Sequence, residues 1–271
     1  MGLGKSVRLK RLFSHPSGRL CSVAIDHFLG YHQDLYMQTG LRELPKTIAA
    51  IVAGKPDSIT MNKGIALGWW PPYAGTIPLI VQSLAARPDD TADETIALPE
   101  DAVRLGADAF ATCAFVRGAT EAAHVRRVAD LVRQAEVWDM PVILHVYPRT
   151  FSNGKVDISF TPEDISWAVR CGIEVGVDVI KVPYCGDVAS YKQIIENCPV
   201  PMVAAGGPKA ANFRASLTMA KEVVQSGARG MVVGRNIWGF PEITKAVNAF
   251  KAVIHDQVDP EKAMQLAGLG A

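Results

Sequence analysis

The feature that most constrains the fold is a repeated alternation of short apolar runs with amphipathic stretches. Each run is four to seven residues long, is bounded by turn residues and contains many β-branched side chains, as is typical of strands buried in a parallel sheet. The runs are too short to be helices of ordinary length. Eight strands are therefore expected, at residues 21–26, 58–61, 77–81, 109–115, 141–147, 178–182, 201–205 and 230–234.

Helix signals occupy most of the intervening stretches. Thr161-Pro162-Glu163-Asp164 supplies an N-cap, a proline in the first turn and early acidic residues, and Gly172 stands where that helix should end. The link over residues 61–77 is short and contains two tryptophans and two prolines, so its helix is expected to be reduced or missing. The polar segment 87–95 is expected to be a loop. Further helices are expected at residues 99–105, 121–138, 188–197, 212–226 and 241–254.

This alternation predicts one (β/α)8 barrel, since eight strand-helix units within about 250 residues are typical of that fold. An open doubly wound sheet is the alternative. A dinucleotide-binding sheet of that kind carries a glycine-rich turn after its first strand, whereas this chain has Asp26-His27-Phe28 there. We therefore expect a single TIM-barrel domain over residues 1–271, with residues 1–20 as an N-terminal extension packing on the barrel.

Charge and cysteine content exclude several classes of protein. The chain has 28 Lys and Arg against 27 Asp and Glu, which disfavours nucleic-acid binding through a broad basic face and leaves only a local basic patch as an alternative. It contains no apolar stretch of about 18 residues, so no membrane span is expected. The five cysteines are odd in number and form no CxxC pair, which disfavours a disulfide framework and a cysteine zinc site. We expect a cytoplasmic protein with reduced thiols.

Three ionisable residues stand near the carboxyl ends of predicted strands, where barrel enzymes build their active sites. Lys181 interrupts an otherwise apolar strand; burial lowers the pKa of such a lysine and provides a nucleophilic amine. Its alternatives are an ion pair with Asp26 or a role as a phosphate-holding cation. Tyr147 precedes Pro148, which is expected to end the strand, so its hydroxyl is either a proton donor and acceptor or a packing residue at the rim. Asp26 either assists proton transfer beside the lysine or caps a helix.

Substrate-binding candidates surround these three. His145 shares the side-chain parity of Tyr147 and either lines the pocket one layer lower or is an ordinary core histidine. His27, beside Asp26, is also assigned to substrate binding. Glycine-rich segments follow the last two strands, and there backbone amides and an arginine can cradle a phosphate; ordinary tight turns are the alternative. The residues of this predicted cradle are Gly206, Gly207, Lys209, Gly234 and Arg235.

The chain resembles the archaeal-type class I fructose-bisphosphate aldolases of the deoxyribose-phosphate aldolase superfamily. The resemblance extends over nearly the whole chain and implies that Lys181 is the Schiff-base lysine, Tyr147 the acid/base tyrosine and Asp26 the aspartate that assists the carbinolamine steps. His145 stands where fructose-bisphosphate enzymes usually carry an aromatic residue. The matching blocks are residues 4–9, Ile25-Asp26-His27, Asn62-Lys63-Gly64, residues 105–109, Tyr147-Pro148-Arg149, Lys181-Val182-Pro183-Tyr184, residues 205–209 and Gly234-Arg235-Asn236-Ile237.

The function expected on these grounds is that of a cofactor-independent lyase, a class I aldolase that cleaves or forms a C–C bond in a phosphorylated ketose. The same superfamily includes aminodideoxyheptulosonate synthases and thiolases acting on other phosphosugars, which remain alternatives. A metal-dependent aldolase or isomerase using His27, His145 and Asp26 is disfavoured because no HxH or HxxxH pair is present. The third alternative is a non-catalytic phosphosugar-binding barrel. The resemblance also implies a homo-oligomer, often a decamer.

Overall fold

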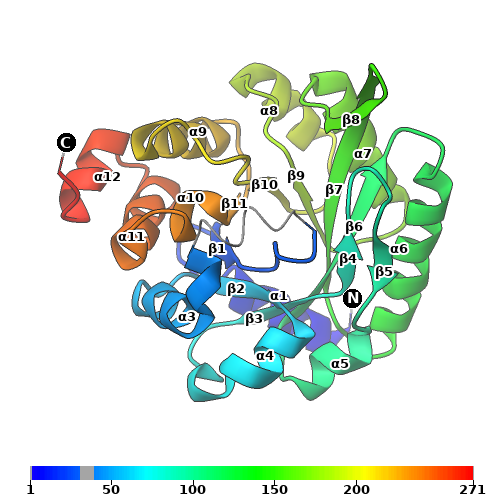
Figure 1. Cartoon of the computed structure of the whole chain (residues 1–271), viewed down its shortest axis with the longest axis horizontal. Helices are drawn as coiled ribbons and strands as arrows, with labels where there is room; N and C mark the ends of the chain where they lie inside the picture. Colours follow the sequence, from blue (N-terminus) through cyan, green and yellow to red (C-terminus); the bar gives the residue numbers. More distant parts are fainter. Residues whose placement is uncertain (1, 31–39, 271) are drawn as a thin grey trace.

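The computed structural model describes residues 2–30 and 40–270. Eight parallel strands form a closed barrel, in which each strand pairs with the next and β11 pairs with β1. The expected (β/α)8 fold is confirmed (Figure 1). The barrel strands, in spatial order, are β1 (Leu20–Ala24), β2 (Ser58–Asn62), β3 (Leu79–Gln82), β6 (Ala109–Val116), β7 (Val142–Ser152), β9 (Val179–Val182), β10 (Met202–Ala205) and β11 (Gly230–Val233).

Helices surround the barrel in Figure 1, and the predicted helices are present with ends shifted by a few residues. The link between β2 and β3 holds a short helix and a 3-10 turn, as its length suggested. In the described part of the chain, no helix combines the length and apolarity needed to cross a membrane. The helices after the first strand are α3 (Leu44–Ala53), α4 (Lys63–Trp69), α5 (Pro99–Arg104), α6 (Glu121–Glu136), α7 (Pro162–Glu174), α8 (Val188–Glu196), α9 (Phe213–Gln225), α10 (Arg235–Trp238), α11 (Ile243–Ile254) and α12 (Pro260–Leu266), with 3-10 turns η1 (Gly40–Glu43) and η2 (Pro71–Tyr73).

Side-chain alternation along the strands divides the core into two parts. One set of apolar side chains packs between the strands and the helices. The other set fills the barrel interior and includes Leu20, Ile80, Ile143, Val179 and Val203. Because the side-chain period of a strand is two, the next inward position along β3, β7 and β9 is Gln82, His145 and Lys181, respectively. The polar residues therefore lie directly above an apolar layer.

An N-terminal helix, α1 (Leu3–Leu12), packs at the opposite end of the barrel. Leu12 is fully buried among the interior side chains. Lys5 Nζ lies 3.1 Å from Asp178 and Arg11 lies 3.2 Å from Asp108, and each of these acids directly precedes a barrel strand. These contacts place α1 over the amino-terminal ends of the strands. The domain predicted over residues 1–271 includes residues 1, 31–39 and 271, which lie outside the described residues.

Two sequence-based expectations about the edges of the barrel need correction. Of the segment 87–95 expected as a loop, residues 87–92 are the connecting turn of a hairpin, but β5 (Asp93–Thr95) is a strand that pairs antiparallel with β4 (Leu84–Ala86). Pro148 does not end its strand, since β7 continues to Ser152 and pairs with β8 (Lys155–Ile158). A proline is tolerated there because β7 has already left its pairing with β9, and the Pro148 carbonyl accepts a hydrogen bond from Ser159.

Candidate active site

The site is a cavity of about 310 Å³ at the carboxyl ends of the barrel strands. Nine of the ten predicted site residues line it, contributed by five of the eight barrel strands and the segments that follow them. Lys209 is not among the lining residues, although it follows directly in the loop after β10. The nine residues that the fold brings together are Asp26, His27, Tyr147, His145, Lys181, Gly206, Gly207, Gly234 and Arg235.

Lys181 lies on the inner face of β9, flanked in register by His145 on β7 and Val203 on β10. Only 5% of the residue is exposed. Burial lowers the pKa of its amine, and the charge of Asp26 opposes that shift only in part. Within residues 2–30 and 40–270, no carboxylate oxygen comes within ion-pair distance of Lys181 Nζ, which disfavours a structural ion pair with Asp26. The lysine is therefore placed to act as a free amine.

Asp26 follows the end of β1 and turns toward the same cavity. Its Oδ2 accepts a hydrogen bond of 3.0 Å from Gln82 Nε2, and His27 and His145 approach its carboxylate at 3.4 and 4.0 Å. Burial alone raises the pKa of Asp26, but His27, Lys181, His145 and the Gln82 hydrogen bond together lower it below its ordinary value. Burial lowers the pKa of His27 to about 4 in spite of Asp26. The cavity thus holds an ionised carboxylate beside a neutral imidazole.

Tyr147 packs at the wall of the cavity. Its ring stacks on Phe115 with centroids 5.8 Å apart, and both belong to an apolar cluster with Leu84 and Ala86 of the β4–β5 hairpin. Register on β7 places Tyr147 one inward position above His145, as the sequence parity indicated. The hydroxyl therefore belongs to the layer above the lysine.

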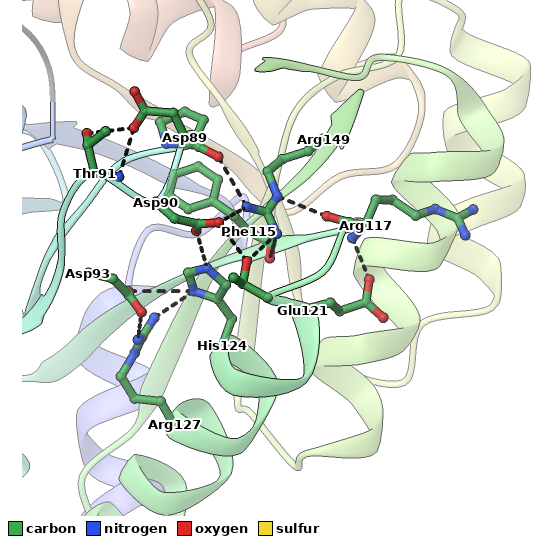
Figure 2. A network of polar contacts seen from close by, with 12 residues as sticks. Asp89, Asp90, Thr91, Asp93, Phe115, Arg117, Glu121, His124, Arg127 and Arg149 are labelled. Atoms are coloured by element: carbon green, nitrogen blue, oxygen red, sulfur yellow. Dashed lines mark hydrogen bonds and ion pairs between the residues drawn. The ribbon is translucent and has the colours of Figure 1, made fainter. Parts of the chain in front are cut away.

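Arg149 holds this wall in place, as Figure 2 shows. Its guanidinium, in a residue only 3% exposed, donates to five acceptors on three segments of chain. Two of these acceptors, the Pro88 carbonyl and Asp90, belong to the hairpin, and Asp90 also contacts buried His124 on α6. The remaining acceptors are Arg117 O, Phe115 O and Thr120 Oγ1. The network thus fixes the hairpin against β6 and α6.

The loops after β10 and β11 are also bound to each other. Asn236 donates from Nδ2 to the carbonyls of Gly206 and Pro208, at 2.8 and 3.0 Å, and its Oδ1 accepts from the Ala210 amide. Gly207 adopts φ +69°, in the region that favours glycine. A Cβ on Gly234 would lie 2.3 Å from the His27 ring. These contacts shape the rim beside Arg235 into a turn. The Gly206 amide, predicted as part of the cradle, donates to the Val232 carbonyl at 2.9 Å, which leaves the Gly207 amide to face an anion.

Sequence reasoning missed several residues that shape the site. Gln82, Asp157 and Phe160 line the cavity, whereas Arg149 and Asn236 hold its walls from behind. Of these residues, only Gln82 could have been found from the local sequence, because it stands two positions after Ile80 and so shares the inward face of its strand. Trp238 is also buried, with 1% of the residue exposed, and its Nε1 donates a hydrogen bond to the Ala24 carbonyl at 2.9 Å.

In the part of the chain that the structure describes, no three His, Cys, Asp or Glu side chains are grouped closely enough to hold a metal ion. His27 and His145 each approach Asp26, but the three residues do not form such a group.

A closed barrel with a polar cavity at the carboxyl ends of its strands defines an enzyme of the TIM-barrel type. Residues 20–239 match the sequence model described as "DeoC/LacD family aldolase", and the chain belongs to this family of lyases. A 2-amino-3,7-dideoxy-D-threo-hept-6-ulosonate synthase of Halobacterium salinarum is 31% identical over 98% of this chain and 97% of its own. A 2-amino-4,5-dihydroxy-6-oxo-7-(phosphonooxy)heptanoate synthase of Streptomyces griseus is 27% identical over 98% of this chain and 96% of its own.

Solved structures agree on the fold. A Schiff-base-forming fructose-1,6-bisphosphate aldolase, studied through its reaction intermediates, is 25% identical and superposes with a TM-score of 0.82, covering 92% of this chain and 99% of its own. An archaeal fructose-1,6-bisphosphate aldolase with its catalytic lysine bound to a carbinolamine is 24% identical, with the same TM-score, over 93% of this chain and 99% of its own. At 24% identity, this similarity supports the fold and nothing further.

Proposed function

We propose that the protein is a class I aldolase that forms a Schiff base between Lys181 and a phosphorylated ketose. One observation carries the proposal: a lysine only 5% exposed, with no ion-pair partner among the described residues, on the inner face of a strand that opens into the cavity. Burying a lysine amine without an ion-pair partner lowers the stability of the fold. Its presence in such a position therefore indicates a chemical use for the amine. The family and the Schiff-base relative of like fold support this use.

The reaction proceeds from binding to covalent chemistry. The substrate phosphate binds at the Gly207 amide and at Arg235, which places the ketone near the middle of the barrel. The Lys181 amine attacks the ketone carbon to give a carbinolamine. Asp26 transfers the protons that convert its hydroxyl into leaving water, and a protonated imine remains.

Cleavage uses the imine as an electron sink. The phenolate of Tyr147 takes the proton from the hydroxyl on the carbon that will become the aldehyde. The C–C bond breaks, and its electron pair neutralises the imine nitrogen to form an enamine. After the aldehyde leaves, Tyr147 returns its proton to the enamine carbon, and water hydrolyses the imine to regenerate the Lys181 amine and release the ketone. The reverse sequence forms the bond.

A second candidate concerns the aldehyde and is favoured by Asp157. In strand order the phosphate cradle lies at β10 and β11, the lysine at β9 and the tyrosine at β7, so the aldehyde portion extends toward β8. Asp157 on β8 lines the cavity there. A carboxylate repels a second phosphate and attracts an ammonium group. The synthases named above make compounds with a 2-amino group, so we propose an amino aldehyde as the alternative partner.

The shared half of both candidates gives a sharp test. Cleaving 2-amino-4,5-dihydroxy-6-oxo-7-(phosphonooxy)heptanoate between the carbons α and β to its ketone, carbons 5 and 4, yields dihydroxyacetone phosphate and a four-carbon 2-amino aldehyde. Fructose 1,6-bisphosphate yields the same ketose phosphate. Dihydroxyacetone phosphate plus borohydride should therefore add a reduced adduct to Lys181, read by peptide mass spectrometry. Lys181→Met should abolish labelling, whereas exposed Lys192→Met should leave it unchanged.

The aldehyde is then identified by competition. The enzyme, loaded with dihydroxyacetone phosphate, is offered glyceraldehyde 3-phosphate or the four-carbon amino aldehyde, and product formation is measured. Preference for the first supports the fructose-bisphosphate activity, and preference for the second supports the synthase activity. Asp157→Asn should weaken selection of the amino aldehyde alone. An adduct on the Lys181→Met protein would contradict the mechanism in both cases.

A further inference from the structure

Gln82 is a buried amide whose hydrogen-bonding capacity is fully used. Its Oε1 accepts from the backbone amides of Ser83 and Leu84 at 2.9 and 3.2 Å. Its Nε2 donates to Asp26 Oδ2 at 3.0 Å and lies 3.2 Å from His145 Nδ1. An amide group has two donor hydrogens and two acceptor positions, so no further partner can be added.

These four contacts determine which end of the amide faces each neighbour. The two backbone N–H groups can only donate, so the oxygen must face Ser83 and Leu84. The nitrogen must then face Asp26 and His145. The reversed orientation would oppose N–H to N–H on one side and oxygen to carboxylate on the other. The orientation of Gln82 thus follows from the backbone of its own strand end.

The orientation of Gln82 in turn sets the protonation of His145. Its Nδ1 faces a donor and must accept, so the ring proton resides on Nε2. His145 Nε2 has no hydrogen bond to any described residue and is not among the buried polar atoms that lack a partner, so it faces the open cavity. In register, the ring lies beside Lys181.

The surrounding charges agree with a neutral ring. Burial and the nearby Lys181 amine lower the pKa of His145 well below its ordinary value, and Asp26 opposes them only in part. His27, from the segment after β1, also disfavours a positive charge on the ring. On β6, the neighbouring titratable group is Cys113, whose pKa burial raises to about 12, so it remains a neutral thiol.

We propose that Gln82 is a positioning residue that holds His145 as the neutral Nε2–H tautomer, and that His145 thereby donates a hydrogen bond to a substrate oxygen beside the carbon bonded to Lys181. The assignment of the substrate rests on the proposed function. The opposite tautomer would present a lone pair at the same point and could not donate to that oxygen. His145 therefore selects a ketose carrying an oxygen at this position over its deoxy counterpart.

The tautomer can be measured in the unmodified enzyme. Magic-angle-spinning ¹⁵N spectra of protein labelled at the histidine ring nitrogens distinguish bare from protonated nitrogens whatever the size of the assembly. The His145 signals are assigned by their loss in His145→Asn. At pH 7 we expect His145 with Nδ1 bare and Nε2 protonated. A ring protonated on Nδ1, or on both nitrogens, would overturn the proposal without any variant of Gln82.

The isosteric variant Gln82→Glu tests the positioning role. One carboxylate oxygen can still accept from the backbone, and the other lies beside the Asp26 carboxylate. The proton that these two acids share lies between them, which leaves none to donate to His145, so we expect His145 to carry its own proton on Nδ1. We expect the spectrum to change accordingly and kcat to fall about 100-fold, as for loss of one donor at a reacting centre. The dissociation constant for inorganic phosphate should stay constant. Gln193→Glu adds the same charge on exposed α8 and should change none of these values.

The outcomes separate the two proposals. A Gln82→Glu enzyme with the wild-type tautomer and wild-type kcat overturns the role of Gln82. A shifted tautomer with unchanged kcat overturns donation by His145. If the tautomer is as expected but borohydride traps no adduct on Lys181, the Schiff-base function fails, and with it the substrate contact, while the tautomer assignment stands.

Discussion

Arg149 offers the most quantitative test of how this site is built, through the variant Arg149→Met. The substitution keeps a long apolar stem but removes five hydrogen bonds of 2.8–3.3 Å (Figure 2). A hydrogen bond to a charged group contributes about 1.5–3 kcal/mol to stability, and the sum over all five bonds would exceed the free energy of unfolding of many domains. That sum overstates the loss, because Asp90 is 31% exposed and water can replace part of the pairing.

The relevant comparison is removal of one partner from a buried ion pair, which costs about 3–5 kcal/mol. We expect Arg149→Met to lower the free energy of unfolding by that amount, measured by urea denaturation followed by circular dichroism. The matched control is Arg170→Met, whose pair with Glu174 is exposed on both sides and should contribute less than about 0.5 kcal/mol. Because the same network holds the hairpin that carries Leu84 and Pro88, the variant should also raise KM.

A double-mutant cycle with Asp90→Asn measures the interaction energy between Arg149 and Asp90. The losses of unfolding free energy in the two single variants should be clearly non-additive, since each variant removes the same contact. A loss below about 1 kcal/mol for Arg149→Met, or full additivity with Asp90→Asn, would refute the reasoning that this buried cation holds the cavity wall.

Tyr147→Phe should still bind inorganic phosphate but turn over about 10²–10⁴-fold more slowly, as for loss of one acid/base group, and unchanged kcat would remove the hydroxyl from the mechanism. Asn236→Ala frees the carbonyls of the Gly206 turn, so calorimetry should show weaker phosphate binding while borohydride still labels Lys181 at saturating substrate; unchanged affinity would contradict the role given to Asn236. The folded-state pKa values of His27, at about 4, and His145 are lowered, so their contribution to stability is present above pH 6.5 and is lost as pH falls toward 4. Urea titrations from pH 7 to 4 should show this decline, and a flat profile would contradict it.

The barrel could be predicted because its signals are local. A strand of four to seven apolar residues and a helix with an N-cap such as Thr161 are recognised from neighbouring residues, and the observed Thr161 side chain does accept from the Asp164 amide. Lys181 stood out for a similar reason, because one charged residue within an apolar strand is visible without a partner. The strand end at Pro148 and the loop expected at Asp93–Thr95 were misjudged because their pairing partners, β8 and β4, form strands only in the folded context.

By itself, the amino-acid sequence determined the order of the strands and helices and which positions face inward, since burial of a short apolar run depends on its own composition and period. Only the tertiary structure decided what those inward residues do. Gln82 and His145 are 63 positions apart, and the Arg149 and Asp90 of the cavity wall are 59 apart. Hydrogen bonds over such separations depend on the register of strands in the closed barrel, because donor and acceptor must meet within about 3 Å.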